Sequence, residues 1–157
     1  VGLWKVKPIA KLTKKEIYEM HDNNFLPLAL GCKIMPSFMS KGSIVNLSSF
    51  ASLMPMKHGS IYSSYKSAAI TFTKSAAAEL SHKGLRVNIV TPGVIETPMT
   101  KSYITKNKDK LLEPIPLNRI GKPEDVVGPV LFLCSRHASY ITGENIIISG
   151  GKYIIQE

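Results

Sequence analysis

Two short apolar runs flank a long helical segment in the middle of the chain. Residues 43–47 and residues 85–91 have the length of buried strands, and the second run stops at a Pro-Gly pair. Residues 60–81 between them are rich in Ala and are followed by Gly84, which predicts a long helix that ends at a glycine. Such an order predicts a βαβ unit with parallel strands and a right-handed crossover. The fold class is therefore α/β.

The segment before the first strand has a helical pattern from Thr13 to Met39. Thr13 and Glu16 have the spacing of a capping box, in which each side chain accepts a hydrogen bond from the other residue's free backbone amide. Pro27 cannot donate a hydrogen bond to the carbonyl of Asn23, so the helix should kink near that residue.

The pattern after the second strand is weaker. Residues 97–116 carry lysines with little apolar periodicity, which predicts a mobile flap rather than a part of the core. Pro123 then begins a helix that runs to about Cys134, and residues 145–148 form a last apolar strand that ends at two glycines.

Composition is typical of a globular protein. Of the 157 residues, 44% are hydrophobic and 20% are charged, which excludes a disordered or fibrous chain. No apolar run approaches the roughly 18 residues of a membrane span. The formal net charge is +9, but Arg is rare and the lysines are scattered, so we expect no nucleic-acid partner and no membrane partner. Cys32 and Cys134 lie in apolar, helix-like surroundings, where buried reduced thiols are expected and a cytoplasmic location fits best.

Polar side chains follow the first predicted strand, at the edge where ligands bind in parallel sheets. Ser48 and Ser49 come directly after this strand, and the next helix opens with Tyr62 and Lys66, which are four residues apart and share one helical face. An ammonium about 4 Å from a phenolate contributes on the order of 4 kcal/mol at an effective dielectric of about 20, although desolvation opposes this effect. We therefore expect the pKa of Tyr62 to fall toward neutrality, so that its phenol can exchange protons while Ser49 polarises a carbonyl group.

Each of these residues also has a structural interpretation. In a chain with six tyrosines and many lysines, a four-residue spacing between the two arises by chance. Ser48 and Ser49 could instead cap the turn after the strand, and Tyr65 would be the functional phenol if the register were shifted.

Taken with their neighbours, these residues resemble the classical short-chain dehydrogenase/reductase family over nearly the whole chain. The family's catalytic Ser lies thirteen positions before the Tyr of its Tyr-x-x-x-Lys motif, which is the spacing of Ser49, Tyr62 and Lys66. The resemblance implies that Tyr62 is the general acid/base, that Lys66 activates it and contacts the cofactor ribose, and that Ser49 polarises the carbonyl. It also implies that Asn24 is the fourth catalytic residue, whose backbone helps to hold a proton-relay water, although Pro27 stands where the family commonly has Gly.

The segment after the second predicted strand is similar to the part of these enzymes that contacts the nicotinamide. Residues 92–99, with the sequence Pro-Gly-Val-Ile-Glu-Thr-Pro-Met, carry this similarity. The resemblance implies an NAD or NADP cofactor, contacted by the backbone of Ile95 and the hydroxyl of Thr97. The cofactor-binding residues that it implies are Tyr62, Lys66, Pro92, Gly93, Ile95 and Thr97.

The family's glycine-rich turn for the cofactor pyrophosphate has no counterpart here, because no Gly-x-Gly occurs in the chain. The chain therefore resembles the carboxyl-terminal two thirds of a family member, with a Rossmann-like doubly wound parallel sheet whose amino-terminal strands are missing. We expect residues 1–157 to be a single partial domain, the catalytic and carboxyl-terminal part of an NAD(P)-binding domain. Residues 43–47 would then be an unpaired sheet edge, so this segment alone should be poorly stable and should bind cofactor weakly.

Together these expectations describe an oxidoreductase that transfers a hydride between NAD(P)(H) and a small carbonyl or secondary-alcohol substrate, such as a 3-oxoacyl group, a sugar or an alcohol. The resemblance also implies a homodimer or homotetramer built on the helices of residues 13–39 and 60–81. The alternative is a noncatalytic remnant that acts only as an oligomerisation module.

The remaining candidates have two interpretations each. Met54 and Met56 either shape an apolar pocket or cover the core, and His58 either lines the substrate mouth or is an exposed loop residue. The other three histidines show no ligand spacing, so we expect no metal site.

Overall fold

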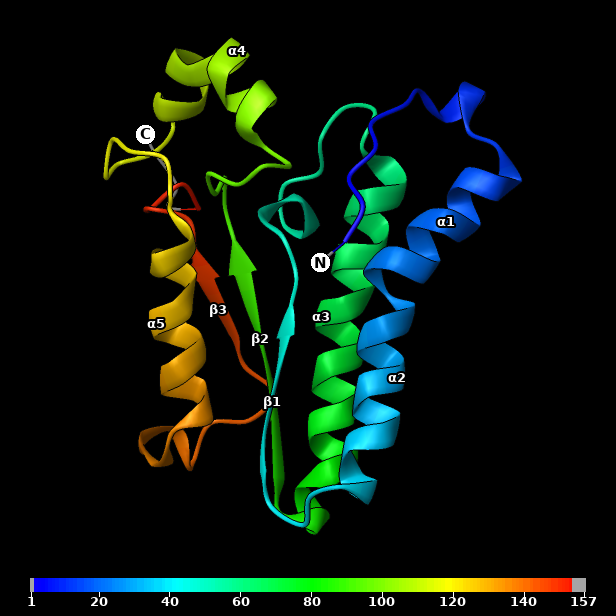
Figure 1. The fold of residues 1–157 in the computed structure, drawn as a ribbon, viewed down its shortest axis with the longest axis vertical. Coiled ribbons are helices and arrows are strands. Elements are labelled where there is room, and N and C mark those ends of the chain that lie inside the picture. The colour runs from blue at the N-terminus through cyan, green and yellow to red at the C-terminus, as the bar shows by residue number, and fades with distance from the viewer. Residues whose placement is uncertain (1, 154–157) are drawn as a thin grey trace.

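The computed structural model describes residues 2–153, which form a layered α/β structure around one parallel sheet (Figure 1). The three strands lie in the order β1-β2-β3, and their bounds are Gly42–Leu47, Leu85–Pro92 and Asn145–Ile148. β1 pairs with β2 along its whole length, and β2 also pairs with β3. Helix α3 (Ser60–Leu80) connects β1 to the parallel strand β2, which confirms the predicted βαβ unit and the α/β class.

Helices cover both faces of the sheet (Figure 1). Helices α1 (Lys14–Asn24), α2 (Leu26–Ile34) and α3 lie on one face, and α5 (Pro123–Cys134) lies on the other. Side chains of β2 alternate between the two sides: Val87 packs in a buried cluster with Ala76 of α3, whereas Val90 packs with Leu133 of α5. The core is thus divided by the sheet into two apolar layers.

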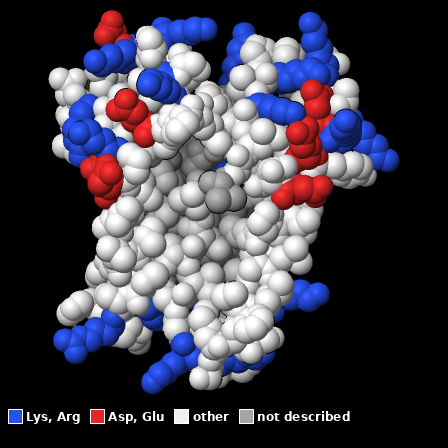
Figure 2. Space-filling model, viewed as in Figure 1, with Lys and Arg blue, Asp and Glu red and all other residues white. Residues whose placement is uncertain are grey.

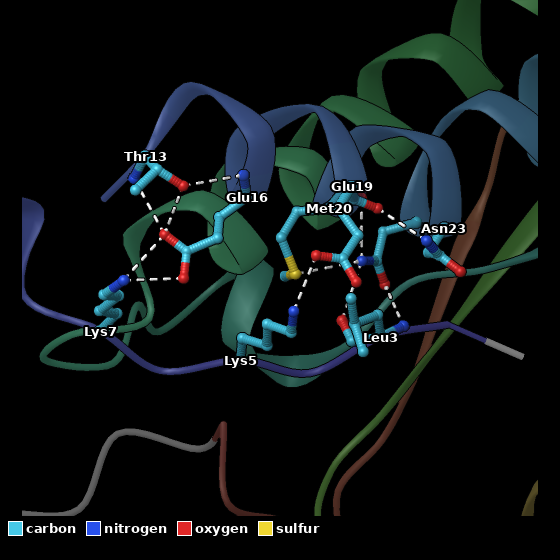
Figure 3. A network of polar contacts seen from close by, with 9 residues as sticks. Leu3, Lys5, Lys7, Thr13, Glu16, Glu19, Met20 and Asn23 are labelled. Carbon is cyan, nitrogen blue, oxygen red and sulfur yellow. Dashed lines mark hydrogen bonds and ion pairs between the residues drawn. The ribbon is translucent and has the colours of Figure 1, made fainter. Parts of the chain in front are cut away.

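The helical segment predicted from Thr13 to Met39 forms two helices with a break at Phe25. The Thr13 hydroxyl accepts a hydrogen bond from the Glu16 amide, and the Glu16 carboxylate accepts one from the Thr13 amide, which confirms the capping box (Figure 3). Pro27 lies in the first turn of α2, where a residue without an N–H is tolerated. The break therefore falls directly after Asn24, as the proline predicted.

The turn between α3 and β2 depends on Gly84. The φ angle of this residue is 71°, in the left-handed region that favours glycine. A Cβ atom at this position would lie 3.1 Å from the carbonyl oxygen of Ser40. Gly84 thus lets the chain leave the helix and enter β2 without a clash.

Residues 97–116 differ from the flap that the sequence predicted. They contain helix α4 (Lys101–Leu112), and the side chains of Ile104, Leu111 and Ile115 are buried. The expectation that this segment stays outside the core was wrong. The backbone of α4 is kinked at Asn107, where φ is -132° and ψ is 21°, so Ile104 and Leu111 do not follow one regular helical period and the sequence pattern did not show their burial.

The two cysteines differ in burial. Both thiols are free, but Cys32 is buried whereas Cys134 is exposed, so the expectation of burial was wrong for Cys134. Cys134 shares a face of α5 with Val127 and Leu131, whose side chains are also exposed. Among residues 2–153, these three side chains on α5 are thus open to solvent.

β1 lies at the edge of the sheet, as predicted for residues 43–47. One side of the strand pairs with β2, and no strand among residues 2–153 pairs with the other side.

Charged side chains gather at the two ends of the molecule, over α1 and α4 at one end and at the opposite end of the sheet, and the middle of this face is almost free of them (Figure 2). Within residues 2–153, the helices are all too short or too polar to cross a membrane.

Candidate active site

The carboxyl end of β1 and the first turns of α3 bring three predicted site residues together. Ser48, directly after β1, is bonded to both β2 and α3, because its amide donates to the carbonyl of Val90 at 2.9 Å and its hydroxyl donates to the carbonyl of Lys66 at 2.8 Å. Ser49 follows, and its side chain lines the same cavity as Tyr62. The Lys66 ammonium lies 5.8 Å from the centroid of the Tyr62 ring and donates at 3.2 Å to the carbonyl of Leu47.

Burial dominates the protonation of this group. It raises the pKa of the Tyr62 phenol above its usual 10, and the neighbouring Ser49 hydroxyl opposes this only in part. Burial also lowers the pKa of Lys66 from 10.5 to about 8. The expectation that Lys66 brings the pKa of Tyr62 toward neutrality was therefore wrong for the chain without ligands, because desolvation of the phenolate outweighs the attraction of the ammonium.

Tyr65, the alternative phenol, lies in a different environment. Its ring packs at 5.4 Å from the ring of His21 and at 6.5 Å from the ring of Phe25, between α3 and the end of α1. It does not line the cavity that Ser49 and Tyr62 share. The register with Tyr62 facing the cavity is the one that the structure adopts.

Asn24 lies at the break between α1 and α2, and its side chain is buried. The side-chain amide holds the amino-terminal segment, since Nδ2 donates to the carbonyl of Leu3 at 2.9 Å and Oδ1 accepts from the amide of Leu3 at 3.3 Å. A Cβ atom on Gly2 would lie 2.9 Å from this Oδ1 and 3.9 Å from the Lys66 ammonium, so Gly2 packs closely between the side chains of Asn24 and Lys66. No backbone N–H among residues 2–153 donates to the carbonyl of Asn24 across the helix break.

Figure 3 shows how this amino-terminal segment is held along α1. Lys5 pairs with Glu19 at 2.8 Å, and Lys7 pairs with Glu16 at 2.8 Å. With the Asn24 contacts, these ion pairs place the segment across the first turns of α3. Trp4, between the two lysines, thereby reaches the cavity next to Tyr62.

The segment after β2 crosses the carboxyl ends of the strands. The amide of Gly93 donates to the carbonyl of Ile148 at 2.8 Å, and a Cβ on Gly93 would lie 3.2 Å from the Cα of Ser149. The hydroxyl of Thr97 lies 3.0 Å from that of Thr100. The amide of Ile95 has no backbone acceptor among residues 2–153 and is available to a ligand.

Two cavities lie beside this segment, and both are lined by Gly93 and Val94. One, of about 350 Å³, contains Ser49 and Tyr62, and the other, of about 300 Å³, reaches Ile95 and the glycines after β3. Met54 and Met56 line the first cavity and so shape a pocket. His58 is exposed and does not line it. Among residues 2–153, no three His, Cys, Asp or Glu side chains are grouped closely enough to hold a metal ion.

Sequence reasoning missed several residues of the first cavity, among them Trp4, Tyr103 and Lys152. Trp4 and Tyr103 contact each other edge to face with their centroids 5.2 Å apart. They come from segments far from Ser49 in the sequence and have no characteristic spacing to it. Only the folded chain brings them to the cavity.

Comparison with known proteins finds relatives over nearly the whole chain. Residues 1–152 match a family model described as enoyl-(acyl carrier protein) reductase. The 3-oxoacyl-(acyl-carrier-protein) reductase FabG of Aquifex aeolicus is 48% identical over 112 residues, which are 71% of this chain and 45% of that protein. The (3R)-3-hydroxyacyl-CoA dehydrogenase of Rattus norvegicus is 40% identical over 130 residues, which are 83% of this chain and 50% of that protein. The chain thus spans about half the length of these curated relatives.

Solved structures share the fold. A short-chain dehydrogenase/reductase of the glucose/ribitol dehydrogenase type from Brucella melitensis superposes with a TM-score of 0.93 and 34% identity, over 99% of this chain and 63% of that one. A 4-hydroxyisoleucine dehydrogenase mutant, complexed with NADH and succinate, gives a TM-score of 0.93 and 29% identity over 100% of this chain and 67% of that one. The arrangement of β1, α3 and β2 is therefore shared with dehydrogenases of known structure.

Proposed function

Because the chain belongs to the classical short-chain dehydrogenase/reductase family, we propose that the protein is an NAD(P)-dependent oxidoreductase acting on a small carbonyl or secondary-alcohol substrate. The observation that carries this proposal is the shared cavity of Ser49 and Tyr62, with the Lys66 ammonium 5.8 Å from the centroid of the Tyr62 ring. The relatives named as reductases and dehydrogenases favour an enzyme over a noncatalytic oligomerisation module.

In the proposed reduction, Tyr62 donates its phenolic proton to the substrate oxygen as that oxygen gains negative charge. The raised pKa of Tyr62 keeps the phenol protonated at neutral pH, as a proton donor requires. Lys66, whose pKa of about 8 leaves it mostly protonated at pH 7, stabilises the phenolate that remains. Ser49 donates a hydrogen bond to the same substrate oxygen, and oxidation of the alcohol runs through the reverse proton transfer.

Asn24 supports the return of a proton to Tyr62 in this proposal. Its carbonyl lies at the helix break and accepts no backbone hydrogen bond among residues 2–153, so it can hold a water molecule. Asn24 is therefore a positioning residue for the proton relay.

The residues present fit a nicotinamide cofactor. The buried Lys66 ammonium makes one hydrogen bond to protein among residues 2–153, which leaves donors for the hydroxyls of a ribose. The free amide of Ile95 and the hydroxyl of Thr97 can contact a carboxamide or phosphate, and Gly93, directly after Pro92, lines the adjoining cavity. A bound nicotinamide supplies or accepts the hydride. The NADH complex of a similarly folded dehydrogenase supports this assignment.

Assembly and location also belong to the proposal. A groove of about 760 Å³ runs between α2 and α3, and the side chains of Leu30 and Ile34 on α2 are more than 40% exposed. These helices are proposed to form the contact of a homodimer or homotetramer, which analytical ultracentrifugation of the complete protein measures. The free thiols of Cys32 and Cys134 support a cytoplasmic location.

Substitution of Ser49 tests the proposed function. In the complete protein, Ser49→Ala should lower kcat for NAD(P)H-dependent reduction of a 3-oxoacyl thioester or another small ketone by about 100-fold or more, since the substrate oxygen loses a hydrogen-bond donor. Ser49→Thr keeps a hydroxyl and should retain more of the activity. Equal turnover of Ser49→Ala and the wild type would contradict the proposal.

A further inference from the structure

The cavity that contains Ser49 and Tyr62 has walls of two kinds. Most of its side chains are apolar or aromatic, and they come from the amino-terminal segment, the loop after β1 and the region of α4. The apolar and aromatic side chains other than Tyr62 are Trp4, Phe50, Ala51, Met54, Pro55, Met56, Val94, Met99, Tyr103 and Leu111. One lining residue carries a charge, and this residue is Lys152.

Lys152 is brought to the cavity by the turn after β3. Gly150 and Gly151 adopt φ angles of 65° and 90°, and the amide of Lys152 donates to the carbonyl of Ser149 at 3.3 Å. The ammonium of Lys152 lies 5.5 Å from the centroid of the Phe50 ring. Phe50 and Lys152 line the same cavity as Ser49 and Tyr62, so the cation faces the space that holds the proposed reaction centre.

The ammonium of Lys152 lacks an acidic partner within residues 2–153, since it takes part in none of the ion pairs formed there. The Phe50 ring attracts the cation but replaces only part of its hydration. Partial burial lowers the pKa of Lys152, because the charged form is desolvated. A carboxylate in the cavity would compensate this loss by a charge-assisted hydrogen bond.

We propose that Lys152 is a specificity-determining residue that selects, for the hydride transfer, ketones with an apolar body and one carboxylate group. The apolar walls hold the body of such a substrate, and the ammonium of Lys152 binds its carboxylate while the carbonyl faces Ser49 and Tyr62. This proposal rests on the proposed function for the reaction, but the carboxylate preference is a property of binding and can be measured without turnover.

Binding of small ligands tests the preference. Hexanoate, hexanamide and hexyl phosphate are titrated by calorimetry into the complete protein in the presence of oxidised cofactor. The wild type should bind hexanoate about 10- to 100-fold more tightly than hexanamide, the range expected for a hydrogen bond between charged groups. Lys152→Met keeps the length of the side chain and should remove this difference, with the affinity for hexanamide unchanged. Lys106→Met removes an exposed lysine from α4, outside the cavity, and should leave the difference intact.

Three results would overturn the proposal. The first is a wild type that binds hexanoate no more tightly than hexanamide, or that shows no measurable hexanoate binding. The second is a preference for hexanoate that persists in Lys152→Met. The third is tighter binding of hexyl phosphate than of hexanoate, which would assign the site to a phosphate group instead.

Turnover separates this proposal from the proposed function. For a 5-oxo acid and its methyl ester, the ratio of kcat/KM values should fall toward one in Lys152→Met, through loss of activity on the acid alone. If acid and ester are reduced equally well by the wild type, the selectivity proposal fails and the oxidoreductase stands. If the carboxylate preference in binding is present but Ser49→Ala leaves turnover unchanged, the proposed catalytic mechanism fails and the assignment of Lys152 stands.

Discussion

Replacement of Lys66 should change how the stability of the protein depends on pH. The side chain of Lys66 is 4% exposed, and burial lowers the pKa of its ammonium from 10.5 to about 8. Between pH 8 and pH 10.5 the unfolded chain therefore binds a proton at Lys66 that the folded chain has lost. Stability must rise with pH in that window, because the unfolded state binds more protons there.

The size of this effect follows from the two pKa values. A change from 10.5 to about 8 corresponds to about 3 kcal/mol of unfolding free energy. Below pH 8 the fold bears this full cost of burying an ammonium, and above pH 10.5 the cost is absent. Lys66→Met has no such group, so its free energy of unfolding relative to the wild type should decrease by about 3 kcal/mol from pH 7 to pH 10.5.

Urea unfolding of the complete protein at pH 7, 8, 9, 10 and 10.5 measures this difference. Lys74→Met is the matched control, since Lys74 is exposed on the same helix α3, and its stability should run parallel to that of the wild type. Groups distant from Lys66 that titrate at alkaline pH cancel in the comparison because all three proteins share them. Parallel curves for Lys66→Met and the wild type would refute the reasoning that burial controls the protonation of Lys66.

Two further predictions concern the elements that hold the site. Gly84→Ala should lower the unfolding free energy by about 1 kcal/mol or more in urea denaturation, because it places a Cβ at a φ of 71° and 3.1 Å from the Ser40 carbonyl oxygen. Gly31→Ala is the control, because Gly31 lies on α2 and its added Cβ would have no atom within 4 Å. This variant should keep or raise the unfolding free energy. An equal loss of stability in both variants would contradict the role of Gly84 in the turn. Glu16, whose pKa is lowered to about 2 by hydrogen bonds from Lys7 and Thr13, should stabilise the fold above pH 4.5, with this contribution lost as the pH falls to 2. The stability difference between the wild type and Glu16→Gln should therefore shrink over that range in thermal melts, and a difference independent of pH would count against the contact.

Local sequence signals were sufficient for most of the fold. The apolar runs at residues 43–47 and 85–91 form the strands β1 and β2, and the Ala-rich segment between them has the length of a crossover helix. Pro27 and Gly84 each act through one backbone constraint, which is why the break and the turn fall where they were predicted. These features depend on residues close together in the sequence.

Features that depend on long-range packing were missed. Leu111 of α4 lines the cavity together with residues distant in the sequence, and the exposure of Cys134 depends on which side of α5 faces the sheet. The spacing of Ser49, Tyr62 and Lys66 located one side of the cavity, but the sign of the pKa shift of Tyr62 depends on how deeply the phenol is buried. Trp4 and Lys152 lie at opposite ends of the chain and meet this site only through the fold.

The role of Tyr62 as the proton donor is tested most directly by turnover of two matched variants of the complete protein. Tyr62→Phe removes the phenolic hydroxyl from the cavity. Tyr65→Phe removes the hydroxyl of a tyrosine outside the cavity, whose ring packs against those of His21 and Phe25. With a reducible ketone and NAD(P)H, kcat should fall by about 100-fold or more in Tyr62→Phe and stay within a few-fold of the wild type in Tyr65→Phe. Undiminished turnover in Tyr62→Phe, or the larger loss in Tyr65→Phe, would contradict the mechanism.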